Sequence, residues 1–277
     1  MSEASMILPD PGRILLCGDL HGNTVATLAV IDHAGAFGAD LIVQVGDLGY
    51  WPRDRQGRSF LQKIGKRLEA RGVELWWVDG NHEDLERLSR LPIQVDGTRW
   101  LRDVHGELSP RIRHLPRGHR WCWGETTWLA VGGAVSVDRD LRTPGVDWFP
   151  QEELTDAEAD AIIAGGPADV VVAHDAPLGV PFLRQWLRQD LPAWRRESPW
   201  PVGRLIRSDE HQRRIRRVLE GVEARMVIHG HHHVRYDDVL KAAHGEVQVH
   251  GLGMDTDPLS ARCLLVDASG SPVLLSS

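Results

Sequence analysis

The sequence predicts an α/β fold in which two mixed β-sheets face each other with helices on the outside, an α/β/β/α arrangement. Two observations lead to this prediction. In the first half of the chain, short apolar runs that end at glycine alternate with helical patterns, as buried strands and their crossover helices do. From about residue 98 to about residue 137, short β-like runs separated by Gly and Pro indicate antiparallel strands and a second sheet. The chain has 277 residues, 42% of them hydrophobic, with no internal repeat or low-complexity linker. We therefore expect a single domain over residues 1–277.

Each strand of the first half is followed by a helix. In the second helix, Phe60, Ile64 and Leu68 recur at i, i+4 and i+8, which gives one apolar face. We expect Glu83 and Asp84 in the first turn of the third helix, where negative charge is favourable. The expected strands span about 13–17, 40–45 and 73–78, and the expected helices span about 23–35, about 58–71 and a short segment from about 82.

The second half mixes strands with two further helices. Thr155 and Glu158 form a capping-box pattern at the start of one of them. Residues 178–207 lack periodicity, so we expect either a lid or insertion, or a packed excursion or oligomer contact. The expected helices span about 155–164 and 208–220, and the expected strands span about 111–115, 120–123, 127–131, 169–173, 226–228, 234–240, 246–250 and 263–266.

Five polar clusters stand out because each follows an apolar run. In open α/β sheets, ligands bind just beyond the carboxyl ends of the strands, so these clusters should meet at one rim. Carboxylate, amide oxygen and imidazole suit hard and borderline cations, and no cysteine pair has metal-ligand spacing. The inventory is that of a two-metal site. The clusters are Gly18-Asp19-Leu20-His21-Gly22, Gly46-Asp47, Gly80-Asn81-His82-Glu83, His174 and Gly230-His231-His232-His233.

In chain order the clusters read D-x-H, G-D, G-N-H-[DE], a lone H and G-H-x-H. This order resembles the pattern of the calcineurin-like metallophosphoesterase superfamily, over roughly residues 13 to 235. The resemblance implies two divalent or transition metal ions, with Mn favoured and Fe or Zn as alternatives, bridged by Asp47. It also implies two sets of further ligands: Asp19, His21 and His233 for the first metal, and Asn81, His174 and His231 for the second.

The resemblance also implies a reaction. A metal-bridged hydroxide would attack a phosphodiester or phosphomonoester, a nucleotide being one candidate, and His82 would hydrogen-bond or protonate the leaving oxygen. If the last cluster is extended, His231 and His233 point to the same side and His232 points away.

A loop that follows the expected strand at 127–131 carries candidate phosphate ligands. Arg139 or Arg142 could bind phosphate in a bidentate manner. The alternative is a surface loop with solvated charges.

The second cluster departs from the pattern of protein Ser/Thr phosphatases, which read G-D-x-V-D-R-G. Tyr50 and Trp51 replace the Asp and Arg of that pattern. The chain is therefore more similar to the small bacterial and phage phosphoesterases, and the partner that orients His82 is open, with Asp54 or a backbone carbonyl as candidates. Two alternatives remain, a protein Ser/Thr phosphatase and a non-catalytic scaffold on the same fold. The presence of every ligand position disfavours the scaffold.

The composition of the chain limits the kinds of partner that we expect. The net charge of −7 and the pI of about 6.0 give no global field that favours nucleic acid. We expect a phosphorylated small molecule or nucleotide as substrate. No apolar run approaches the length of a membrane span, and no secretory signal is visible. The 3 cysteines are few, odd in number and far apart, so a reducing cytoplasm is expected. The sequence does not indicate an oligomeric state.

Overall fold

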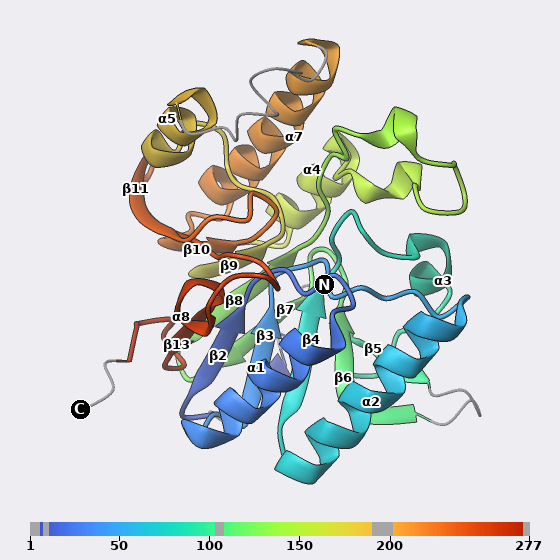
Figure 1. The fold of residues 1–277 in the computed structure, drawn as a ribbon. Helices are drawn as coiled ribbons and strands as arrows, with labels where there is room; N and C mark the ends of the chain where they lie inside the picture. Colours follow the sequence, from blue (N-terminus) through green and yellow to red (C-terminus); the bar gives the residue numbers. More distant parts are fainter. Residues whose placement is uncertain (1–5, 8–10, 103–107, 190–201, 274–277) are drawn as a thin grey trace.

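The computed structural model describes residues 6–7, 11–102, 108–189 and 202–273 (Figure 1). Its strands are β1 (Met6–Ile7), β2 (Ile14–Cys17), β3 (Leu41–Gln44), β4 (Glu74–Val78), β5 (Arg99–Arg102), β6 (Leu108–Leu115), β7 (Arg120–Trp123), β8 (Thr126–Val131), β9 (Val170–Ala173), β10 (Met226–His229), β11 (Tyr236–Ala242), β12 (Gly245–Gly251) and β13 (Cys263–Val266). Its helices are α1 (Thr24–Ala36), α2 (Arg55–Arg71), α3 (Leu85–Ser89), η1 (Arg139–Leu141), η2 (Pro150–Glu152), α4 (Asp156–Ala164), α5 (Pro181–Gln189), α7 (Val202–Gly221) and α8 (Leu259–Arg262).

The strands form two mixed sheets. One sheet has six strands in the order β13-β2-β3-β4-β6-β5, and the other has seven in the order β1-β7-β8-β9-β10-β12-β11. Strands β2, β3, β4 and β6 run parallel, as do β8, β9, β10 and β12, while β13, β5 and β11 are antiparallel additions. The predicted fold class is confirmed. The parallel centre of each sheet brings the carboxyl ends of its strands to a common edge.

Three hydrophobic clusters correspond to the three interfaces between four layers. The adjacent residues of β4 separate two of them: Trp77 faces Phe60 and Ile64 of α2, whereas Trp76 packs among Trp121 and other residues between the sheets. The third cluster joins the seven-stranded sheet to α4, α5 and α7. Helices α1 and α2 cover the outer face of the six-stranded sheet (Figure 1). Strands buried on both faces carry continuous apolar runs, which is the pattern that the sequence shows.

One strand prediction was wrong about pairing. The strand expected at 111–115 is part of β6 and lies in the first sheet, parallel to β4, with Ile112 opposite Leu75. Only β7 and β8 form the expected antiparallel pair, with Trp121 opposite Trp128. Strand β5 was not predicted. An apolar run indicates that a segment is buried, but it does not specify which strand lies beside it.

The third helix begins later than expected. Asp84 is its N-cap and accepts a hydrogen bond from the backbone N–H of Arg87 at 3.2 Å. Glu83 precedes the helix and is fully buried, where it accepts hydrogen bonds from the backbone N–H of Leu48 (2.9 Å) and the indole N–H of Trp77 (3.2 Å). Glu83 therefore ties the β3 loop to β4, and the expectation that it lies in the first helical turn was wrong.

The described residues of the segment expected to lack regular structure are partly helical. Helix α5 covers 181–189, and α7 begins at 202, before the expected start at 208; residues 190–201 lie outside the described part of the chain. These helices do not test whether residues 178–207 form a lid, an insertion, a packed excursion or an oligomer contact, so that expectation stays a prediction. The capping box of α4 is present as predicted, with Thr155 and Glu158 bonding each other's backbone N–H. None of the described helices is both long enough and apolar enough to cross a membrane.

We predict that Ile64→Ala lowers the free energy of unfolding by about 2–5 kcal/mol, because it leaves a cavity between α2 and the six-stranded sheet. Ile64 is fully buried. The control is Val25→Ala on α1. Val25 is 80% exposed, so its substitution should change the free energy of unfolding by no more than about 0.5 kcal/mol. Urea unfolding measures both. Equal effects of the two substitutions would contradict the packing described here.

Candidate metal centre

The candidate ligands lie where five parallel strands end. Three of these strands belong to the six-stranded sheet and two to the other sheet, so the site lies where the carboxyl edges of both sheets meet. The residues that follow each strand are Asp19 after β2, Asp47 after β3, Asn81 after β4, His174 after β9, and His231 and His233 after β10.

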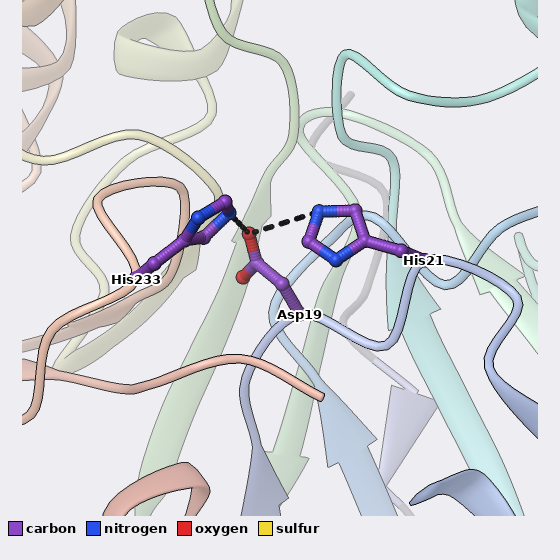
Figure 2. A group of neighbouring side chains, drawn as sticks. All are labelled: Asp19, His21 and His233. Atoms are coloured by element: carbon purple, nitrogen blue, oxygen red, sulfur yellow. Dashed lines mark ion pairs between the residues drawn. The ribbon is translucent and has the colours of Figure 1, made fainter. Parts of the chain in front are cut away.

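Asp19, His21 and His233 form the first group. Their donor atoms all lie within 4.8 Å of one another. Asp19 Oδ2 is 3.1 Å from His233 Nε2 and 4.0 Å from His21 Nε2, and Figure 2 shows the carboxylate lying between the two rings. Asp19 is fully buried, whereas the two histidines are partly exposed. The group can therefore hold a cation that remains accessible from one side.

Asp19, Asp47 and His174 form the second group, also within 4.8 Å of one another. Asp47 Oδ1 lies 3.5 Å from His174 Nε2, and Asp47 Oδ2 lies 3.4 Å from His21 Nε2. The two oxygens of one carboxylate thus face an imidazole from each group. One carboxylate is therefore in contact with both ligand groups.

Two features show that the donor set fits cations. Asp47 Oδ2 is buried and accepts no hydrogen bond from the described residues. His174 Nδ1 lies 2.9 Å from the carbonyl oxygen of Val45, and because a carbonyl only accepts, Nδ1 carries a proton and Nε2 is the nitrogen left to face the site. That atom lies 3.1 Å from Asn81 Oδ1, which is an acceptor. Positive charge must therefore lie between these buried atoms, either as a proton on Nε2 or as a bound cation.

The pKa values of the site residues indicate a negative electrostatic potential at the candidate ligands. Burial lowers the pKa of His174, but Asp47 outweighs it and raises the pKa to about 10. Burial likewise lowers the pKa of His21, but the neighbouring carboxylate of Asp47 outweighs this effect and contributes to raising the pKa to about 9. Burial of Asp47 would raise its pKa, but His174 and His82 hold it well below the usual range. Protons thus occupy the imidazoles when no metal is present, and metal binding must release them.

Backbone strain gathers at the candidate ligands. Among the described residues, the non-glycine positions with positive φ are His21 (45°), Asp47 (58°), His231 (64°), His233 (56°) and Glu223 (57°). Four of these five are candidate ligands, and left-handed backbone at such residues costs free energy and concentrates at functional sites.

The left-handed backbone corrects one prediction, because the segment that carries His231 and His233 is not extended. His232 nevertheless turns away from the candidate ligands. Its Nε2 lies 3.2 Å from Asp175 Oδ1, and Asp175 is fully buried. His232 therefore has a hydrogen-bonded position of its own behind the site.

His82 lies at the site without belonging to either ligand group. Its backbone N–H donates to Asp47 Oδ1 at 2.7 Å, and its ring lies 5.6 Å from the ring of His21. Arg142 Nη2 is 2.8 Å from His82 Nε2 and 2.9 Å from Asp138 Oδ2. Burial lowers the pKa of His82; Asp47 opposes this effect, and Arg142 and His21 add to it.

The expected partners of His82 need correction. Asp54 caps α2, where its side chain accepts a hydrogen bond from the N–H of Gly57 at 2.6 Å, and the nearest polar partner of the His82 ring is Arg142. Arg139 pairs with Asp140 at 3.6 Å, and no described contact links it to His82 or to a candidate ligand.

The aromatic residues of the second cluster belong to the packing. Tyr50 is 5% exposed, and its ring lies 6.2 Å from that of Trp77. Trp51 packs on Phe149 at 6.3 Å. Neither supplies a charge in place of the Asp and Arg of the protein phosphatase pattern.

Several residues around the site were not found from the sequence. Asp255 Oδ1 lies 3.2 Å from His21 Nδ1, and Asp255 Oδ2 accepts a hydrogen bond from Asn23 at 2.7 Å. Ser136 accepts a hydrogen bond from Asn81 at 3.0 Å and is itself bonded to Glu152. Asp255, Ser136 and Glu152 belong to none of the five polar clusters, so the sequence carried no signal for these contacts.

The comparisons with known proteins agree with this geometry. The family model of the calcineurin-like phosphoesterases matches residues 12–235. The chain belongs to this family. The resemblance predicted from the five clusters is thereby confirmed, and membership places the chain among metal-dependent hydrolases of phosphoesters, which typically bind divalent metals. No curated protein matches the chain significantly in sequence.

Solved structures share the fold at low sequence identity. The protein TT1561 of Thermus thermophilus is 13% identical, with a TM-score of 0.52 over 92% of this chain and 98% of that chain. Another structure is 14% identical, with a TM-score of 0.55 over 96% and 98%. A dimetal phosphatase from Danio rerio is 11% identical, with a TM-score of 0.48 over 93% of each chain. The first two likenesses support the fold alone.

We predict that Gly46→Ala weakens metal binding at the site. A Cβ at Gly46 would lie 2.2 Å from His174 Nδ1, so the ring must leave its position. The control is Gly72→Ala at the end of α2, where φ is also positive (+69°) but nothing lies within 4 Å of the added Cβ. Both variants should lose about 1–2 kcal/mol of stability from backbone strain, and Gly46→Ala should lose more because its Cβ clashes with His174. Only Gly46→Ala should lose metal affinity in calorimetry; an equal loss in both variants would contradict the close approach.

Proposed function

We propose that the protein is a binuclear metal-dependent phosphoesterase that hydrolyses a phosphodiester or phosphomonoester. The observation that supports this most strongly is the position of Asp47, whose two oxygens each face an imidazole of a different ligand group. The first cation would be held by Asp19, His21 and His233, and the second by Asn81, His174 and His231, with Asp47 shared. Burial lowers the pKa of His231, which keeps its imidazole neutral, as a metal ligand must be.

The ligand set favours Mn, with Fe or Zn as alternatives, because it combines carboxylate, amide and imidazole and contains no thiolate. When bound, two cations would polarise the phosphoryl oxygens and lower the pKa of water. The protein's own part is to hold the ligands at fixed positions and to keep Asp47 ionised. The low pKa of Asp47 is consistent with that part.

His82 and Arg142 are our candidates for direct contact with the substrate. His82 would hydrogen-bond or protonate the leaving oxygen. Arg142 would donate to the phosphate, since its guanidinium already lies 2.8 Å from His82 Nε2 and has N–H groups to share. We assign this contact to Arg142 rather than to Arg139, because Arg142 is the one that reaches His82.

The substrate is proposed to be a phosphorylated small molecule or a nucleotide in the cytoplasm, and a nucleic acid is less favoured by the net charge of −7. A protein Ser/Thr phosphatase is disfavoured. Buried Tyr50 and packed Trp51 hold the positions of its Asp and Arg. The presence of His82 and of all seven ligand residues argues against a non-catalytic scaffold.

We predict different effects for a ligand and for the catalytic histidine. Asp47→Asn should lower both metal occupancy and turnover, because it weakens a shared ligand. His82→Ala should retain both metals and lose rate by about 10²-fold or more. Metal analysis together with hydrolysis of an aryl phosphodiester measures both. A His82→Ala protein that loses an ion but turns over normally per occupied site would assign His82 to the ligands instead.

We also predict that Arg142→Ala lowers kcat/KM by about 10–100-fold, which corresponds to the about 1.5–3 kcal/mol of a hydrogen bond to a charged group. Metal content should not change. Arg139→Ala, three residues earlier in the same loop, is the matched control and should stay within about twofold of the wild type. If Arg139→Ala causes the larger loss, the phosphate contact belongs to Arg139.

A further inference from the structure

Asn81 differs from the carboxylate ligands in that the two ends of its side chain are chemically different. A carboxylate can offer either oxygen to a cation, whereas an amide has an acceptor oxygen at one end and a donor NH₂ at the other. Only Oδ1 can bind metal. A rotation of 180° about the last side-chain bond would turn the NH₂ towards the cation, so some contact must fix which end of the amide faces the site.

A buried hydrogen-bond chain reaches the far end of this amide. Asn81 Nδ2 donates to Ser136 Oγ at 3.0 Å, and Ser136 Oγ donates to Glu152 Oε2 at 2.7 Å. The backbone N–H of Ser136 donates to the other oxygen, Glu152 Oε1, at 2.8 Å. All three side chains are at least 98% buried, so water does not substitute for these partners.

The direction of the chain follows from the number of protons. A hydroxyl has one proton, and Ser136 donates it to Glu152 Oε2, which can only accept when the pH lies above the raised pKa of Glu152. Ser136 Oγ then has only lone pairs left for Asn81. Its partner must therefore be the NH₂ end, which leaves Asn81 Oδ1 facing His174 Nε2 at 3.1 Å. The orientation of the amide is set by a carboxylate that does not touch it.

Glu152 is itself held firmly. Its carbonyl oxygen accepts hydrogen bonds from the N–H of Ala134 and from Arg117 Nη2, both at 3.0 Å. Arg117 also pairs with Asp79 at 2.8 Å, and Asp79 lies two residues before Asn81. The same arginine thus ties the Glu152 loop to the end of β4. The position of the carboxylate relative to Asn81 is fixed from two sides.

The carboxylate of Glu152 is costly for the fold. In the described part of the chain it makes no ion pair with a basic side chain, although it is fully buried. Burial raises its pKa to about 7 against the lowering effect of the bonds from Ser136. A neutral side chain would suit this position better if only packing mattered.

We propose that Glu152 and Ser136 are positioning residues that hold the Asn81 amide with its oxygen towards the second metal. The proposal rests on the proposed function, because it takes Asn81 to be a ligand of that metal. Ser136→Ala removes the acceptor for the amide NH₂. Glu152→Gln keeps the shape, but its own NH₂ can donate to Ser136 Oγ, which frees the serine proton for Asn81 and favours the flipped amide.

The test measures Mn²⁺ binding to the full chain by calorimetry, with the metal content of each protein as a check. Glu152→Gln and Ser136→Ala should each weaken one of the two metal sites by about 10–100-fold, the usual effect of a residue that orients a ligand. The other site should be unaffected. The matched control is Glu153→Gln, the neighbouring residue, whose carboxylate pairs with Arg207 and does not contact Ser136. It should bind both ions as the wild type does.

A second background separates orientation from general damage. Asn81→Asp presents an oxygen whichever way it is turned, so Glu152→Gln should no longer weaken Mn²⁺ binding there, and its effect could reverse. An equal loss in both backgrounds, or no loss in the wild-type background, would overturn the proposal. Wild-type protein that binds two ions but hydrolyses no phosphoester would instead refute the proposed function and leave this metal-affinity test valid. Wild-type protein that binds no Mn²⁺ would overturn both.

Discussion

The site depends on one buried carboxylate. Asp47 lies between two imidazoles, with one oxygen accepting a hydrogen bond from the backbone of His82 and the other accepting none from the described residues. In water such a group would be solvated, and in a protein interior it is strongly unfavourable unless positive charge lies beside it. The raised pKa values of His21 and His174 are the protein's response when protons supply that charge. Two cations would supply it more completely.

The surrounding backbone is arranged to bring that carboxylate into place. Positive φ at Asp47 turns the chain sharply after β3, and the flanking glycine allows His174 to approach from the other sheet. Gly80 plays the same part after β4, since a Cβ there would lie 2.1 Å from Asp47 Oδ1. Packing at the three interfaces between the four layers offsets the free-energy cost of this strained backbone. The packed layers form the stable part of the fold, and the strained residues lie at the sheet edge that carries the candidate ligands.

The sequence predicted the layers and the candidate ligands because both depend on local patterns. Glycine and a polar residue after each apolar run mark the end of a strand, and parallel strands bring those ends together. What it did not predict depends on contacts between distant segments. The pairing of β6 with β4 is one example, and the contact of Arg142 with His82 across 60 residues is another. Glu152 and Asp255 belong to the same class, since nothing in their local sequence distinguishes them from acidic residues that lie at the surface. The role of the seven ligands remains a prediction that metal binding must test.

The most direct test is a crystal structure of the protein grown with Mn²⁺, with the ions located by their anomalous scattering. Our account predicts two peaks about 3.5–4 Å apart, with one oxygen of Asp47 at about 2.0–2.2 Å from each. A single ion, or two ions that both lie more than about 3 Å from Asp47, would contradict the central claim that this carboxylate bridges a binuclear centre.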